Sequence, residues 1–131
     1  MNDDEARKML TDRLLAKADM ALAAARREHE AGDCGLAMNR IYYACFYGAC
    51  AVLTQERQQY SRHSGVRAAI HRHLVKTGRL AVDLGRFYDD AFNDRQEADY
   101  DATAEFDPLT VQGRIVLAEH FLWEMKRLLR P

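Results

Sequence analysis

The sequence predicts an all-α fold, an up-and-down bundle of four long helices plus one short helix. Three observations favour this class. The 131 residues include only two prolines, Pro108 and Pro131. The chain is rich in alanine, leucine, arginine and glutamate, which lose little rotamer freedom in a helix. Its apolar residues recur at spacings of three and four, without the alternation typical of strands. Residues 1–131 are therefore expected to form a single domain.

The first half of the chain is expected to form two of the long helices. The first covers about Asp4–Glu30 and ends at a turn, Gly32-Asp33. Its apolar stripe consists of Leu10, Leu14, Ala18, Ala21 and Ala25. The second covers about Gly35–Arg57 and is apolar nearly all round, which is typical of a helix at the centre of a bundle. One side of this helix is narrow, because it carries Ala44, Gly48 and Ala51.

The second half of the chain is expected to form the short helix and the other two long ones. Ser64 is the expected N-cap of the short helix, which Gly78 ends. The fourth helix begins near Leu80 and ends between Ala98 and Asp101. Asp107-Pro108 supplies the N-cap and the first-turn proline of the last helix. The bundle-facing seam of that helix consists of Val111, Ile115, Ala118, Leu122, Met125 and Leu129.

Composition excludes several kinds of location and site. No apolar stretch approaches the roughly 18 to 20 residues of a transmembrane helix, and no signal-peptide core follows the acidic N-terminus. The three cysteines lack metal-ligand spacing. The acidic run that begins at Asp89 lacks the ligand spacing and central glycine of a calcium loop. We therefore expect a cytoplasmic protein with no membrane partner, no bound metal and no cofactor.

Charge is unevenly distributed along the chain, although the net charge is only −1. Between Gln55 and Arg86, seven basic residues and three histidines stand against two acidic residues. Between Asp89 and Asp107, eight acidic residues stand against Arg95 alone. Two interpretations are open: two solvated faces that differ in sign, or a basic surface for a phosphate-bearing partner beside an acidic segment that limits it.

Arg95 is the most informative single residue. On a helical wheel of about 100° per residue it falls among Leu84, Tyr88 and Ala91, within the apolar stripe of the fourth helix. A guanidinium there requires a carboxylate, a cleft or a subunit interface, and Asp99, four residues on, is the expected partner. The alternative is a side chain that extends past the last apolar turn to water.

Three segments of the chain carry a joint resemblance to a known family. The first is NRIYYACFY, residues 39–47. The second combines HSGV, residues 63–66, with HRHLVKTG, residues 71–78. The third is RQEADYD, residues 95–101. Together, and in this order, they resemble the HEPN domain family in its stand-alone bacterial and archaeal branch.

The resemblance implies a helical bundle that is commonly a symmetric homodimer. Many family members are ribonucleases or toxins, often encoded beside a minimal nucleotidyltransferase that serves as antitoxin. Their active site is an arginine followed, after a short polar spacer, by a histidine, and two copies face each other across the dimer. By this resemblance Arg95 is the site arginine. The spacer ends at Tyr100, and no histidine appears before His120.

Three functions remain open because the motif histidine is missing. The leading one is binding of nucleotide or RNA, together with a partner nucleotidyltransferase, in a toxin–antitoxin-type system. The second is an active metal-independent ribonuclease toxin, and the third is a purely structural dimeric module in which Arg95 pairs with Asp99. The third helix offers His63 and His71 as replacements for the histidine, provided that the fold brings one of them near Arg95.

Each candidate residue has an expected role. Arg95 and Tyr100 are the candidate catalytic residues. The candidate contacts to nucleotide or RNA are Arg95, His63, His71 and Asp99. Tyr100 is also a candidate adenylylation site, because in related toxin–antitoxin pairs the partner nucleotidyltransferase attaches adenylate to a tyrosine close to the arginine motif.

Overall fold

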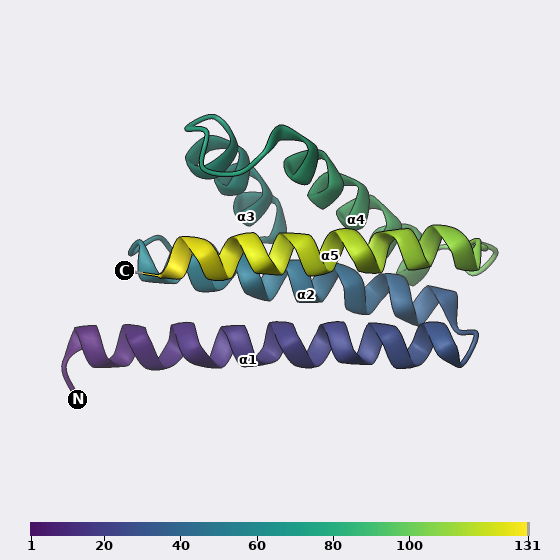
Figure 1. The fold of residues 1–131 in the computed structure, drawn as a ribbon, viewed down its shortest axis with the longest axis horizontal. Helices are drawn as coiled ribbons and strands as arrows, with labels where there is room; N and C mark the ends of the chain where they lie inside the picture. The colour runs from purple at the N-terminus through teal and green to yellow at the C-terminus, as the bar shows by residue number, and fades with distance from the viewer. Residues whose placement is uncertain (131) are drawn as a thin grey trace.

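The computed structural model describes residues 1–130, and their helices confirm the predicted all-α class. The elements are α1 (Asp3–Glu30), α2 (Cys34–Gln55), α3 (His63–Ala69), the π-helical segment η1 (Ile70–Val75), α4 (Val82–Tyr100) and α5 (Pro108–Leu129). In Figure 1, α1, α2 and α5 run alongside one another, and α3 and α4 slant across one side of this group. No helix within residues 1–130 is long and apolar enough to span a membrane.

The central helix is α2, as its all-round apolar pattern predicted. It packs against α1, α4 and α5, and more than half of its residues are buried. Its narrow side is also confirmed, because Ala44 and Ala51 are fully buried. A Cβ atom added at Gly48 would lie only 2.6 Å from Cδ2 of Leu122, so glycine is what allows α5 to approach α2 this closely.

Three of the four long helices begin with a side-chain cap. Asn2 Oδ1 accepts a hydrogen bond from the Glu5 amide at the start of α1, and Asp33 Oδ1 accepts one from the Leu36 amide at the start of α2. The predicted cap of the last helix is confirmed, because Asp107 Oδ1 accepts from the Leu109 amide at 3.1 Å. By contrast, α4 begins after Ala81 without a side-chain cap in the described chain.

The third and fourth helices differ from prediction at their starts. The predicted Ser64 cap is wrong, because α3 already begins at His63 and Arg62 occupies the N-cap position. The fourth helix begins at Val82, two residues after the predicted start near Leu80, and it ends at Tyr100, within the predicted limits of Ala98 and Asp101. Gly78, whose φ of 79° lies in the left-handed region, ends the helical stretch made of α3 and η1, as predicted.

Residues 70–75 were predicted as part of the short helix that Gly78 ends, but not as the π-helical segment η1. Its hydrogen bonds include one from the Lys76 amide to the His71 carbonyl, five residues back. This wider turn packs closely on α4, because a Cβ atom at Gly85 would lie 2.8 Å from Cγ2 of Val75 and 3.2 Å from Cε1 of His71. Glycine at position 85 therefore permits the close approach of η1 to α4.

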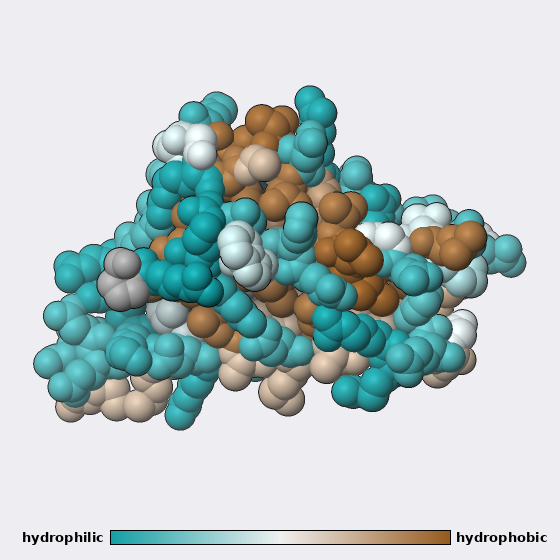
Figure 2. Space-filling view, viewed as in Figure 1, coloured by the Kyte–Doolittle hydropathy of each residue, from teal (hydrophilic) through white to brown (hydrophobic). Residues whose placement is uncertain are grey.

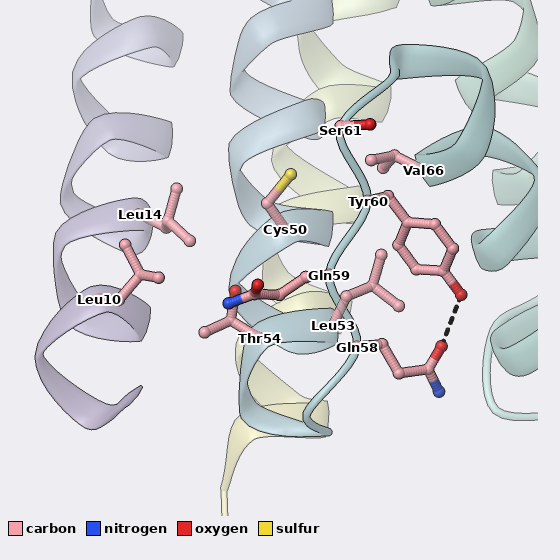
Figure 3. A pocket seen from close by; sticks show the side chains of 10 residues that line it. All are labelled: Leu10, Leu14, Cys50, Leu53, Thr54, Gln58, Gln59, Tyr60, Ser61 and Val66. Carbon is pink, nitrogen blue, oxygen red and sulfur yellow. Dashed lines mark hydrogen bonds between the residues drawn. The ribbon is translucent and has the colours of Figure 1, made fainter. Parts of the chain in front are cut away.

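The apolar stripe of α1 is only partly buried. Ala18, Ala21 and Ala25 are in the core as predicted, but Leu10 is exposed. Leu10 and Leu14 instead line an open cavity of about 550 Å³ between α1, the end of α2 and residues 58–61. Figure 3 shows both leucine side chains facing this space, with the Tyr60 hydroxyl hydrogen-bonded to Gln58 on its far wall. The N-terminal part of the predicted stripe thus lies outside the packed core.

Candidate functional site

The Arg95 side chain lies inside the bundle, as its position in the apolar stripe predicted. Only 12% of it is exposed, so it does not extend to water past the end of α4. The guanidinium carbon lies 5.2 Å from the centre of the Tyr42 ring and 5.4 Å from that of Tyr43. Its Nη2 donates a hydrogen bond to the Tyr43 hydroxyl at 3.2 Å. Two aromatic rings of α2 therefore hold a cation supplied by α4.

Asp99 is the expected carboxylate partner, but the pairing is loose. Its Oδ2 lies 3.6 Å from Arg95 Nε, which is too far for a hydrogen bond. The shorter contacts of Asp99 come from Asn39, whose Nδ2 donates to both carboxylate oxygens at 3.1 and 3.2 Å. Arg40 Nε in turn donates to Asn39 Oδ1 at 2.9 Å. Asp99 is thus held mainly by α2.

The environment of Arg95 Nε is therefore unusual for a polar atom. It is fully buried and has no hydrogen-bond partner within residues 1–130. Buried polar groups nearly always find a partner, because leaving one unpaired costs about 1–3 kcal/mol and more if it is charged. Arg95 therefore retains hydrogen-bonding capacity that the described part of the protein does not use.

His63 joins the same group of residues from the start of α3. Its Nδ1 is hydrogen-bonded to the Tyr42 hydroxyl at 2.6 Å, and its ring stacks on Phe46 with centroids 4.3 Å apart. Burial and the nearby positive charge of Arg95 both lower the pKa of His63. Burial raises the pKa of Tyr42 to about 12, so this phenol keeps its proton at neutral pH. His63 is therefore mainly neutral at pH 7.

We call Asn39, Tyr42, Tyr43, His63, Arg95 and Asp99 the Arg95 cluster. Of the residues predicted for the site, the fold brings Arg95, Asp99 and His63 together in it. His71 does not join them, because its Nε2 contacts Asp89 Oδ1 at 3.0 Å between η1 and α4. Tyr100 also lies apart, because it is the last residue of α4 and is 80% exposed.

Further cations surround the cluster that were not predicted as site residues. Arg40 stacks over Tyr43, Arg67 over Phe92 and Lys17 over Tyr47, with cation-to-ring distances of 5.1, 4.4 and 5.0 Å. Asn39 was likewise missed, although it opens the NRIYYACFY segment. Positive charge thus collects around aromatic rings at this site, which suits an anionic ligand that also carries flat rings.

Comparison with known proteins gives consistent results. The HEPN domain family matches residues 11–128. A protein of Thermotoga maritima named "UPF0332 protein" is 43% identical over 93 residues, which cover 71% of this chain and 70% of that protein. A protein of Methanocaldococcus jannaschii named "Putative toxin MJ0142" is 36% identical over 94 residues, covering 72% of this chain and 64% of the relative.

A third relative, "UPF0332 protein glr0978" of Gloeobacter violaceus, is 33% identical over 87 residues, covering 66% of this chain and 69% of its own. The family match includes every helix that contributes to the Arg95 cluster. The chain therefore belongs to the HEPN domain family.

Proposed function

We propose that the Arg95 cluster binds the phosphate of a nucleotide or of RNA, and that the chain works with a partner nucleotidyltransferase in a toxin–antitoxin-type system. The observation that carries the proposal is the mostly buried Arg95 guanidinium, which two tyrosine rings hold and which has no carboxylate at hydrogen-bond distance within residues 1–130. A guanidinium presents parallel N–H donors that match two phosphate oxygens. The toxin–antitoxin setting is supported by the family and by the printed name of the M. jannaschii relative.

Two other arginines, Arg79 and Arg114, show how an arginine with a structural role is paired. Arg114 Nε donates to Asp94 at 2.9 Å, and Arg79 Nη1 donates to Glu56 at 3.0 Å with a second bond from Nη2 to the same carboxylate. Both are satisfied by carboxylates at hydrogen-bond distance. Arg95 lies 3.6 Å from Asp99 instead. This difference favours a ligand role over a purely structural ion pair.

Charge-preserving substitution tests the proposal. Arg95→Lys keeps the positive charge but loses the guanidinium fork, so affinity for ATP and for a single-stranded RNA oligonucleotide is expected to fall about tenfold. Fluorescence anisotropy over a salt series measures it, and wild-type binding should weaken as salt increases. Arg79→Lys serves as the control and should bind as wild type. The proposal is wrong if wild type binds neither probe at low salt, or if Arg95→Lys binds both as tightly.

RNA cleavage is a second candidate function, and the position of His63 favours it. In the tautomer whose Nδ1–H donates to Tyr42, His63 Nε2 carries a free lone pair. That nitrogen would accept the proton of a ribose 2′-OH while O2′ attacks the adjacent phosphorus. The P–O5′ bond breaks, and the proton passes from His63 to the leaving O5′, so no other reactant is consumed. Arg95 would stabilise the charge that develops on phosphate.

Cleavage by this route has a specific pH dependence. Because burial and Arg95 lower the pKa of His63, the rate should rise with pH and level off below the ordinary histidine value of about 6.5. His63→Asn should abolish cleavage, with a loss on the order of 100-fold or more. His71→Asn, which removes a histidine paired with Asp89 outside the cluster, should leave it unchanged. Equal activity in wild type and His63→Asn would rule out this route.

Tyr100 is the proposed site of adenylylation by the partner enzyme. Its ring is exposed at the end of α4, so a second protein can reach the hydroxyl. In this reaction the tyrosine oxygen bonds to the α-phosphorus of ATP, and pyrophosphate leaves. Incubation with ATP and a minimal nucleotidyltransferase encoded beside this gene should add one adenylate, located at Tyr100 by mass spectrometry. Tyr60, which is also exposed, should remain unmodified. Addition to a Tyr100→Phe variant would contradict the assignment.

A further inference from the structure

Asp99 is the carboxylate beside Arg95, and it is therefore a built-in competitor of any phosphate that binds the guanidinium. Its Oδ2 lies 3.6 Å from Arg95 Nε, whereas a charge-assisted N–H···O bond is usually about 2.7–2.9 Å long. The two residues are four apart on one face of α4, so a small rotation of the Asp99 side chain would close this gap. The separation of two opposite charges that lie so close together requires a cause elsewhere in the fold.

Asn39 on α2 supplies that cause. Its Nδ2 donates to both carboxylate oxygens of Asp99, at 3.1 and 3.2 Å. Two other carboxylates that pair with arginine, Asp94 and Glu56, receive no amide hydrogen bond within residues 1–130. Both lie at hydrogen-bond distance from their arginines, at 2.9 and 3.0 Å. The carboxylate that stays back from its arginine is thus the one that an amide holds.

The orientation of the Asn39 amide is fixed by its two neighbours. Arg40 Nε donates to Asn39 Oδ1 at 2.9 Å. Because a guanidinium can only donate and an ionised carboxylate can only accept, Asn39 presents its oxygen to Arg40 and its NH₂ group to Asp99. A flipped amide would lose all three hydrogen bonds. The Arg40 guanidinium also lies 5.1 Å from the centre of the Tyr43 ring, which holds it in place. The amide is therefore kept in the orientation that restrains Asp99.

We propose that Asn39 is a positioning residue, which holds the Asp99 carboxylate away from Arg95 and so leaves the guanidinium available to a phosphate. The part of this proposal that concerns affinity rests on the proposed phosphate binding. Without the amide of Asn39, the carboxylate pairs with Arg95, and a phosphate has to displace it. Asn39 thus sets the affinity of the site through Asp99, without itself contacting the phosphate.

Affinity for ATP in two single variants and their double variant tests the proposal. Asn39→Leu removes the amide at similar volume, and affinity should fall about tenfold because the phosphate must break a carboxylate–guanidinium pair. Asp99→Ala removes the competing negative charge, so it should bind ATP more tightly than wild type. In the Asp99→Ala background, Asn39→Leu should change affinity by less than about twofold. Isothermal titration calorimetry measures all four proteins.

The double variant separates a positioning role from general damage to the fold. If Asn39→Leu only disturbed packing, it would cost the same affinity with and without Asp99, and an equal loss in both backgrounds would overturn the proposal. Asn93→Leu makes the same substitution at an exposed residue of α4 and, as the matched control, should bind ATP as wild type. Figure 2 shows hydrophobic side chains already exposed along the line that α5 follows in Figure 1, so one further leucine is not expected to cause aggregation.

A measurement without ligand tests the position of Asp99 directly. The NMR signal of the Arg95 Nε–H group, assigned by its loss in Arg95→Lys, reports on a donor that has no hydrogen-bond partner within residues 1–130. In Asn39→Leu, pairing with Asp99 should move the proton signal downfield, and adding Asp99→Ala should reverse this shift. An unchanged signal in Asn39→Leu would overturn the proposal even if ATP binds. If the signal moves as expected but wild type does not bind ATP, the position of Asp99 is confirmed and the proposed phosphate binding is wrong.

Discussion

Arg95→Met is expected to weaken ligand binding about 100-fold while leaving the free energy of unfolding unchanged or slightly higher. The bound phosphate would lose its main charge-assisted hydrogen bonds, each worth about 1.5–3 kcal/mol. Stability should not suffer, because replacing an imperfectly paired buried cation by an apolar side chain is often neutral or stabilising. Asp99 keeps the two hydrogen bonds from Asn39 after the substitution. Binding titrations and urea denaturation measure the two quantities.

Arg114→Met is the matched control for this prediction. Arg114 is partly buried in the same way, but its Nε donates to Asp94 at 2.9 Å and its Nη1 lies 3.6 Å from Asp90. Burial already raises the pKa of Asp94, and Arg114 opposes that effect. Loss of this partner should cost about 1–3 kcal/mol of stability with little change in affinity. If Arg95→Met instead destabilises the fold and leaves binding intact, Arg95 has the structural role.

Phe121→Ala is expected to destabilise the fold by about 3–5 kcal/mol. Phe121 is fully buried on α5, and its ring centre lies 5.6 Å from that of Tyr88 and 6.5 Å from that of Phe87. Both neighbours belong to α4, so the substitution leaves a cavity between α4 and α5. Since small domains have only about 5–15 kcal/mol of stability, this is a large fraction of the total.

Thermal unfolding followed by circular dichroism measures this effect, and the midpoint should fall by about 10 °C or more. Leu117→Ala, at an exposed residue of the same helix, should shift the midpoint far less. Ligand affinity should also fall in Phe121→Ala, because α4 carries Arg95 and depends on this contact. An unchanged midpoint would mean that α4 does not rely on Phe121 for its position.

Helix existence and burial could be predicted here because both follow from local periodicity. The all-round apolar character of α2 and the buried seam of α5 were sufficient to place them in the core. The π-helical turn η1 was not predicted, and it packs closely on α4 at Gly85, a contact between helices that local periodicity does not show. The burial of Leu10 was wrongly expected for a related reason. Periodicity identifies an apolar face but not whether a neighbouring helix reaches that far along it.

The candidate site was predictable only in part. The wheel position of Arg95 and the i to i+4 relation to Asp99 are local properties of one helix, and both were recovered. Which of His63 and His71 lies near Arg95 is not a local property, because it depends on how α3 docks against α2. Asn39 was missed for the same reason: its contact with Asp99 joins residues sixty positions apart. The family resemblance identified Arg95 as the site arginine, but it did not indicate which residue of α3 lies beside it.

The origin of the Arg95 cluster in three separate helices has a consequence for partly unfolded states. Helical hydrogen bonds are local to each helix, but the cluster exists only once α3 and α4 have docked on α2. In a compact state that keeps its helices and loses side-chain packing, the helix signal would persist while the His63–Tyr42 and Arg95–Tyr43 hydrogen bonds disappear. Ligand affinity therefore reports docking of the helices and not their formation. Mild acid or denaturant should abolish the two properties at different points.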